Sequence, residues 1–188
     1  MDVAATDTIR RPPATESALP LNLRGRELDV HMRAAHTLLP SHGNWAVQFS
    51  AGNLVRIVLG IRDPSRGWYT AHFANLAATR LGLPFGRMRV YYSGTLPAVL
   101  QTPQARRLLP KGSEPGCFAT AVGEVIDTMC GKVIENGRTS FAALNGVDPS
   151  NVAFHPTAGR FFLRGSTNSA SLLEIARIAK EGRRQSPA

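Results

Sequence analysis

Two glycine-containing segments of the sequence carry residue types that bind anions. Ser65-Arg66-Gly67 precedes one expected helix, and Gly112-Ser113 precedes another. Backbone N–H groups at the start of a helix hold phosphate groups well, because the helix dipole is positive there. An arginine side chain adds a planar fork of five donors. The candidate ligands of an anionic cofactor are therefore Ser65, Arg66, Gly67, Gly112 and Ser113; the alternative is that both segments are ordinary turns.

The other ionisable residues do not indicate a catalytic or metal-binding site. Glu124 and Asp127 lie three positions apart on an expected helix. This spacing is more typical of a solvated face than of an acid–base pair. The histidines, at positions 31, 36, 42, 72 and 155, lack a cysteine or an acid at metal-ligand spacing. The sequence also contains no nucleophile elbow and no P-loop motif.

The two cysteines also indicate a structural role. Cys117 and Cys130 are expected on one helix, where thirteen positions correspond to roughly 20 Å. A disulfide needs Cα atoms within about 7 Å, so a continuous helix excludes a bridge between them. Two thiols are also fewer than an iron–sulfur cluster normally takes. We expect both to be buried and reduced.

The composition fits a globular protein with a positive charge. Apolar residues make up 43% of the 188 residues, which suits one domain or two small lobes. The net charge of +9 comes from 19 arginines and three lysines against 13 acids, and the arginines are scattered. Nucleic-acid binding is one interpretation, but the scatter of the arginines favours a bias of composition. Attraction to an acidic partner or to a pyrophosphate-bearing cofactor uses the same charge equally well. No apolar run approaches the roughly 20 residues of a membrane span, and no export signal is apparent, so we expect a cytoplasmic protein.

Strand and helix patterns alternate along the first half of the chain. Residues 45–49 and 54–59 are predicted to form a β-hairpin, and 68–81 a helix that Gly82 and Pro84 end. Residues 89–92 read as a further strand. The proline-rich segment 94–116 is predicted to be an extended loop.

The second half is dominated by one helix. Apolar residues with three- and four-residue spacing define its buried face: Phe118, Val122, Val125, Ile126, Met129 and Val133. This helix extends to about Leu144, with a break expected near 136–137 and a cap at Asn145-Gly146. A second hairpin (152–154 and 160–163) and a helix capped by Ser169 or Ser171 follow. The predicted fold class is α/β (α+β), with short hairpins and strands alternating with helices.

These elements resemble, in order, the middle of the molybdopterin-binding large subunit of the xanthine dehydrogenase, aldehyde oxidase and carbon monoxide dehydrogenase family. The residues that carry the resemblance run from about 45 to 180. They are Leu59-Gly60, Ser65-Arg66-Gly67, Leu81-Gly82-Leu83-Pro84, Met88-Arg89-Val90, Gly112-Ser113, Asn145-Gly146-Val147-Asp148-Pro149, Val152-Ala153-Phe154 and Ser171-Leu172-Leu173-Glu174-Ile175-Ala176.

The resemblance implies a partial molybdopterin-binding domain. Residues 26–181 would form it, with lobes at about 45–110 and 111–181, between a flexible tail (1–25) and a frayed end (182–188). The chain would hold part of the pterin of the molybdenum cofactor in an oxidoreductase that hydroxylates its substrate. Other subunits would supply the rest, and the alternatives are a non-catalytic relative that acts as an interaction module and, third, a nucleic-acid-binding protein.

The sequence departs from the family at both cofactor loops. Arg66 stands where the family has a glutamine between two glycines, and Ser65 replaces the first glycine. Glu114 and Pro115 follow Gly112-Ser113 where the family has Arg-Ser. The family's glutamate in a Gly-x-Gly-Glu motif has no counterpart here. We therefore expect no catalysis by this chain alone. Because the expected helix 68–81 is apolar on most sides, we also expect a homodimer or a hetero-complex with Trp68 or Phe73 near the interface.

Overall fold

The computed structural model describes residues 28–34, 38–39, 43–50, 53–96, 109 and 116–184, without the side chains of 182–184. The predicted tail and the predicted loop ligands Gly112 and Ser113 lie outside the described residues. Within them, the protein has an α+β fold in which helices and short strands alternate.

A four-stranded sheet forms the first half of the fold. Its strands are β1 (Val30–Met32), β2 (Trp45–Phe49), β3 (Val55–Leu59) and β4 (Met88–Tyr92), in the order β1-β2-β3-β4. β1, β2 and β3 pair antiparallel, whereas β3 and β4 are parallel because α1 (Thr70–Leu81) connects them. A 3-10 turn, η1 (Phe85–Arg87), leads from α1 into β4.

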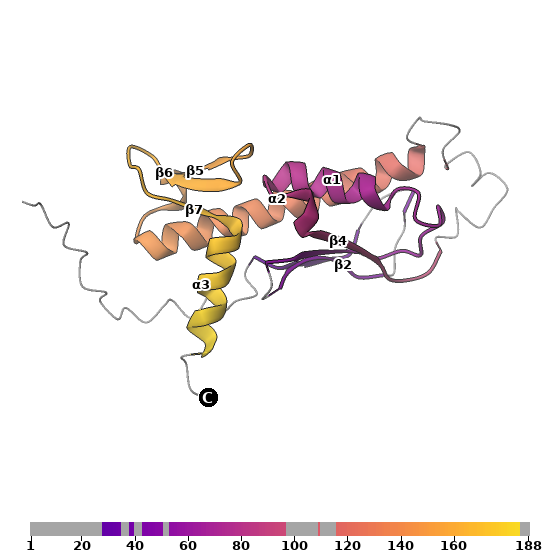
Figure 1. Ribbon diagram of the computed structural model, residues 1–188, viewed down its shortest axis with the longest axis horizontal. Coiled ribbons are helices and arrows are strands. Elements are labelled where there is room, and N and C mark those ends of the chain that lie inside the picture. Colours follow the sequence, from indigo (N-terminus) through magenta and orange to yellow (C-terminus); the bar gives the residue numbers. More distant parts are fainter. Residues whose placement is uncertain are drawn as a thin grey trace, which may run out of the picture.

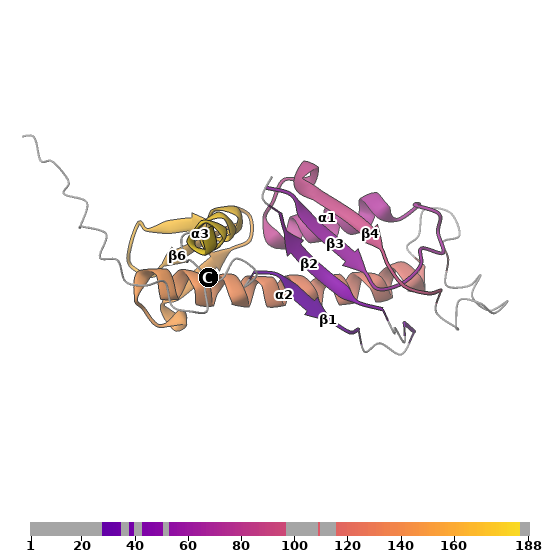
Figure 2. The ribbon, with the colours of Figure 1, turned by 90° about the horizontal axis from the view of Figure 1, so that it is seen from below.

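Two helices cover the same face of this sheet. α1 and the long α2 (Cys117–Asn145) lie side by side, above the strands in Figure 1 and behind them in Figure 2. Alternate strand residues, among them Trp45, Val47, Ile57 and Leu59, point toward the helices and are fully buried. The opposite face of the sheet has no described helix or strand over it.

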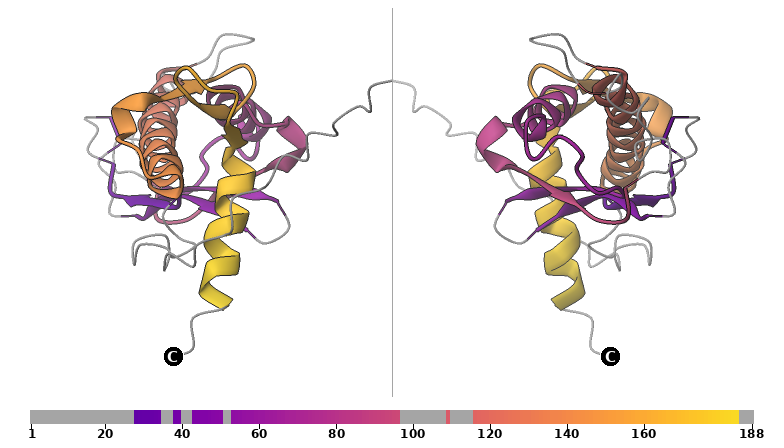
Figure 3. Two further views of the ribbon diagram at one scale, coloured as in Figure 1. Left: turned by 90° about the vertical axis from the view of Figure 1, so that its left-hand side faces the viewer. Right: turned by 90° about the vertical axis from the view of Figure 1, so that its right-hand side faces the viewer.

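A smaller three-stranded sheet packs on the carboxyl-terminal half of α2. It consists of β5 (Val152–His155), β6 (Arg160–Leu163) and β7 (Ser169–Ser171), all antiparallel, preceded by η4 (Pro149–Asn151). The last helix, α3 (Leu172–Arg184), runs from this sheet across the end of the first one (Figures 1 and 3). It extends into the segment predicted to be frayed.

α2 is continuous, so the break predicted near 136–137 is wrong. Gly137 lies in the helix interior, where a Cβ atom would be 2.5 Å from Cζ of Phe161. The glycine therefore admits an aromatic ring of the second sheet. The predicted apolar face is confirmed: Phe118, Val122, Val125 and Met129 are all buried.

The ends of the helices follow from their sequences. Gly82 (φ 63°) and Gly146 (φ 64°) end α1 and α2 in the left-handed conformation that glycine adopts at low cost. Ser171 Oγ accepts a hydrogen bond from the Glu174 N–H (3.1 Å), and the Glu174 carboxylate accepts one from the Ser171 N–H (2.6 Å). This capping box confirms the predicted cap of α3.

α1 is buried on one side only. Phe73 is fully buried in the chain's own core beside Phe118, with ring centroids 6.1 Å apart. Of the two residues predicted near an interface, Phe73 therefore does not reach the surface, and the interface itself stays a prediction. Trp68, which precedes the helix, is 69% exposed. None of the helices in the described part of the chain combines the length and apolarity needed to cross a membrane.

Candidate functional site

The predicted loop Ser65-Arg66-Gly67 lies at the carboxyl ends of the parallel strands β3 and β4. In sheets with parallel strands, this end is where ligands usually bind. The two strand ends are held close together. Ser93 N–H donates to Leu59 O (2.8 Å), and a Cβ atom on Gly94 (φ 121°) would lie 2.6 Å from the Gly60 carbonyl oxygen. The loop therefore starts from a tightly packed strand pair.

Asp63 organises this loop from inside. Its Oδ1 accepts hydrogen bonds from Ser65 N–H (2.8 Å) and Ser65 Oγ (2.6 Å), and its Oδ2 accepts one from Gly67 N–H. The carboxylate thus occupies two of the backbone donors that the sequence assigned to an anionic ligand. In this conformation the Ser65 and Gly67 N–H groups do not cradle an external phosphate.

Asp63 was not predicted as a site residue, although its sequence context carries a signal for this turn. The same tripeptide, Asp-Pro-Ser, recurs at 148–150, where Asp148 Oδ1 accepts from Ser150 N–H at 2.8 Å. Aspartate commonly bonds the backbone two residues ahead in such turns. The hydrogen bonds from the Ser150 side chain and N–H lower the pKa of Asp148.

Arg66 is the loop residue that remains exposed. Its backbone has φ 53°, in the left-handed region that non-glycine residues rarely adopt. Among the described residues, no hydrogen bond or ion pair engages its guanidinium group. Arg66 therefore presents a charged fork outward at the start of α1, and this geometry suits an anionic group.

The amino-terminal ends of α1 and α2 meet beside the loop. Gly116, the N-cap of α2, donates its N–H to Tyr69 Oη (3.1 Å), and Tyr69 is the N-cap of α1. Further along, Arg80 Nε donates to Asp127 Oδ1 (2.8 Å). The two contacts pair residues in the same order along both helices, so α1 and α2 run parallel. Both positive dipole ends therefore lie at the same end of the molecule (Figure 2).

The two helix ends have no side-chain cap among the described residues, although the Thr70 N–H in the first turn of α1 donates to Gly67 O (3.2 Å). The first-turn N–H groups of a helix have no partner within the helix itself. The described residues therefore fit an anionic group through the Arg66 side chain and two helix ends, and not through the backbone of 65–67.

The phenol group of Tyr92 lies next to the first turn of α1. Tyr92 Oη and Thr70 Oγ1 are 3.2 Å apart, joining β4 to the first turn of α1. Burial raises the pKa of Tyr92, the hydrogen bond with Thr70 lowers it, and the Asp63 charge raises it further. The net direction of the pKa shift is upward, so this phenol stays protonated and neutral at the start of α1.

Comparisons with known proteins do not identify the chain. No protein-family model, curated protein or solved structure matches it. The functional interpretation consequently rests on the sequence resemblance and on the geometry of this site.

The remaining acidic and cysteine side chains of the described residues lie outside the 63–67 loop. Glu124 and Asp127 are exposed, as expected for a solvated face, and Asp127 pairs with Arg80. No group of histidine, cysteine and acidic side chains in the described ranges could hold a metal ion. Both cysteines are free thiols; Cys130 is buried as predicted, whereas Cys117 is exposed at the start of α2, which corrects the expectation for that residue.

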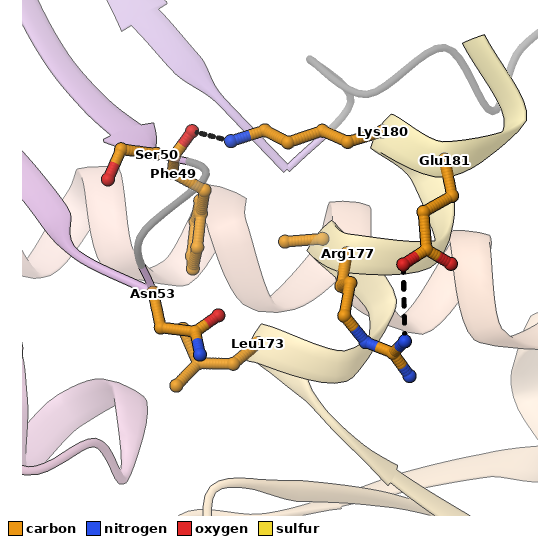
Figure 4. Close-up of a pocket in the computed structure, with 8 residues that line it drawn as sticks. Phe49, Ser50, Asn53, Leu173, Arg177, Lys180 and Glu181 are labelled. Carbon is orange, nitrogen blue, oxygen red and sulfur yellow. Dashed lines mark hydrogen bonds and ion pairs between the residues drawn. The ribbon is translucent and has the colours of Figure 1, made fainter. Parts of the chain in front are cut away.

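A cavity of about 200 Å³ lies at the other end of β3, between the β2–β3 turn and α3 (Figure 4). The Lys180 ammonium group donates to the Phe49 carbonyl oxygen, and Arg177 pairs with Glu181 at 3.2 Å. The cavity contains none of the predicted site residues. Its charged side chains bond other groups of the protein: Lys180 links α3 to β2, and Arg177 pairs with Glu181 within α3. We therefore assign no ligand to this cavity.

Proposed function

We propose that this chain is a partial molybdenum-cofactor-binding subunit of a xanthine dehydrogenase-type hydroxylase, which holds part of the pterin and needs other chains for catalysis. One observation carries the proposal. The two segments that resemble the family's cofactor loops precede two helices whose amino-terminal ends meet, through Gly116 N–H and Tyr69 Oη. This arrangement is unlike two unrelated turns, and it supports a shared anionic ligand.

In the proposed complex, this chain binds and orients the cofactor. Arg66 and the first turns of α1 and α2 would hold the pyrophosphate of the pterin by charge-assisted hydrogen bonds. When bound, the cofactor supplies the metal-centred oxidation of a C–H bond. The Gly112-Ser113 segment remains part of the proposal by resemblance. The partners would be the other subunits of the hydroxylase in the cytoplasm, and self-association into a homodimer is the alternative assembly.

A second candidate is a non-catalytic relative that acts as an interaction module. Asp63 favours this function, because its carboxylate takes the Ser65 and Gly67 N–H groups. Arg66 favours it as well, because it replaces the glutamine of the family. In that case the loop is a self-contained turn and binds no pterin.

Anion binding separates the two candidates. The full chain is purified from a host that makes the cofactor, and pterin content is measured by fluorescence after acid oxidation. Pyrophosphate is then titrated against wild type, Arg66→Ala and a control, Arg164→Ala, which removes an exposed arginine from the turn after β6. We expect wild type to bind pyrophosphate, Arg66→Ala to bind it about tenfold more weakly, equivalent to about 1.4 kcal/mol, and the control to match wild type.

Two results would reject cofactor binding. One is the absence of both pterin and pyrophosphate binding in wild type. The other is an equal loss of affinity in Arg66→Ala and Arg164→Ala, which would assign binding to the overall positive charge. Either result leaves the interaction module as the better description.

A further inference from the structure

The outward face of the four-stranded sheet is basic and has no described element over it. Figure 2 looks directly onto this face, and α1 and α2 lie behind it. Its outward residues form two rows across the strands. One row is Gln48, Arg56 and Arg89, and the other is His31, Ala46, Val58 and Tyr91.

Two arginines stand directly opposite each other in this face. Arg56 on β3 pairs in register with Arg89 on β4, and both side chains are exposed. Like charges on directly opposed cross-strand neighbours destabilise a sheet. None of the outward strand positions of the described sheet carries an acid. An acidic counterpart outside the described strands would therefore relieve the repulsion between these two arginines.

The charge of this region is concentrated in the sequence as well. Between residues 43 and 96 the chain has six arginines and one acid, Asp63, whose carboxylate bonds its own loop. Of the six, Arg56 and Arg89 lie at outward strand positions, whereas Arg80 lies on α1 and pairs with Asp127. Asp29 lies at the β1 edge of the face, where its carboxylate accepts a hydrogen bond from Phe49 N–H (2.9 Å). A shallow hollow lined by Asp29, His31, Gln48 and Arg56 is open at this edge.

The chemistry of the face favours a protein partner over a nucleic acid. Its centre is apolar, with Val58 half-buried and the Tyr91 ring 49% exposed, and arginines flank it. Tyrosine and arginine beside a small apolar centre are typical of protein interfaces. Single-stranded nucleic acids instead require several aromatic side chains for stacking, and Tyr91 is the one aromatic residue at the outward strand positions described.

Arg89 is also held in position before any partner binds. Its Nη1 donates to the carbonyl oxygens of Gly86 (2.9 Å) and Met88 (2.8 Å). The other donors of the guanidinium group remain for a carboxylate. A side chain that is already ordered loses less entropy on binding.

We propose that this face, defined by Arg56, Val58, Arg89 and Tyr91, is a docking surface for an acidic protein surface that also carries aromatic or aliphatic side chains. Charge complementarity selects the partner, and Val58 and Tyr91 form the apolar centre of the contact. The inference does not depend on cofactor binding, because none of these four residues belongs to the candidate site at Arg66.

Synthetic polyanions provide the test. The full chain is titrated with fluorescently labelled polyglutamate, with a glutamate–tyrosine copolymer and with oligo-dT of similar charge, all at low salt. Variants are Arg56→Gln/Arg89→Gln, Tyr91→Ala and the charge-matched control Arg164→Gln/Arg177→Gln, which changes two exposed arginines of the other sheet and α3. Circular dichroism and the melting temperature verify that each variant is folded.

We expect the wild type to bind the copolymer more tightly than polyglutamate. The Arg56/Arg89 variant should lose about tenfold in affinity for both peptides, equivalent to about 1.4 kcal/mol, while the control loses less than about twofold. Tyr91→Ala should abolish the preference for the copolymer. The proposal is overturned by equal losses in the two double variants, by equal affinities for the two peptides, or by tighter binding of oligo-dT.

Discussion

Gly82 and Gly159 meet backbone to backbone, where the end of α1 touches the β5–β6 turn. A Cβ atom on Gly82 would overlap both Gly159 and the Pro156 carbonyl group, and a Cβ on Gly159 would overlap the Gly82 carbonyl group. Both residues also have positive φ, 63° and 59°. The contact joins α1, which packs on the first sheet, to the second sheet. The two backbones can come this close only because neither residue has a Cβ atom.

Gly82→Ala should therefore destabilise the protein strongly. The left-handed conformation costs an L-residue about 1–2 kcal/mol, and forced overlap with backbone costs about 1–3 kcal/mol more. We expect a loss of roughly 2–5 kcal/mol in the free energy of unfolding, measured by urea denaturation. Gly131→Ala, in the interior of α2, is the control, because an added Cβ atom there has no neighbour within 4 Å. This change should raise the free energy of unfolding by roughly 0.5–1 kcal/mol. A neutral Gly82→Ala would contradict the close contact.

Val125→Asp should unfold or aggregate the chain. Val125 is 6% exposed on the face of α2 that packs on the first sheet and α1. Burying an unpaired carboxylate costs several kcal/mol, a large part of a typical stability of about 5–15 kcal/mol. Thr120→Asp, an exposed change in the same helix, should leave the melting temperature nearly unchanged. Equal melting temperatures for the two variants would show that the face is not core.

Some elements of this fold can be predicted from the sequence, and others cannot. The spacing of Phe118, Val122 and Val125 predicts α2 because a buried face imposes a period of 3.6. Neither β1 nor β7 was predicted. Each has only three residues, and Ser169-Ala170-Ser171 is a strand solely through its pairing with β6. Such strands depend on tertiary contacts that no local pattern encodes.

The candidate site was predictable in part. The sequence predicted the start of α1 to within two residues, because glycine and serine before an apolar helix indicate a loop. It did not predict that Asp63 would occupy the loop, because the choice between an internal and an external anion depends on three-dimensional geometry. Nor could it predict the contact between Gly116 and Tyr69, which are distant in sequence.

The two thiols should differ sharply in reactivity. Burial raises the pKa of Cys130 to about 12, with the Asp127 charge acting in the same direction and Arg80 opposing it. Cys117 is exposed. Because the thiolate is the nucleophile, Ellman's reagent at pH 8 should modify one thiol rapidly in the native chain and both in denaturant. Cys117→Ser should remove the rapid phase; rapid modification of that variant would show that Cys130 is accessible.

The stability of the protein should also fall at alkaline pH because of Cys130. Its folded-state pKa lies above the ordinary value of 9.0, so its contribution is fully present below pH 9 and is lost as the pH rises toward 12. Cys130→Ala should weaken this decline relative to wild type in urea titrations at pH 8 and pH 10.5. An identical pH dependence in both proteins would contradict the burial of the thiol.

The purified chain alone should not hydroxylate purines, aldehydes or N-heterocycles. Arg66 stands in place of the family's glutamine, and the sequence contains no Gly-x-Gly-Glu motif. The acid of the candidate loop, Asp63, is bonded to backbone N–H groups and is not positioned as a base. Steady-state assays against a metal-free control measure this directly. Turnover of any of these substrates above the control would show that the chain is self-sufficient.

Asp63→Asn should open the loop to external anions. An asparagine oxygen can still accept from Ser65 N–H, but its amide nitrogen faces Gly67 N–H, so that donor is released and one negative charge is removed. We expect a loss of about 1–3 kcal/mol in stability. The affinity for pyrophosphate should rise roughly threefold to tenfold, which corresponds to about 0.7–1.4 kcal/mol.

The matched control for this change is Asp148→Asn in the second Asp-Pro-Ser turn. Asp148 makes the same bond to the serine N–H two residues ahead, but it lies at the far end of α2 from Arg66. It should lower stability without changing pyrophosphate affinity. If both variants bind pyrophosphate equally well, the gain reflects net charge alone. If Asp63→Asn binds no better than wild type, the Ser65 and Gly67 N–H groups are not part of an anion site, and Asp63 serves only to hold the turn.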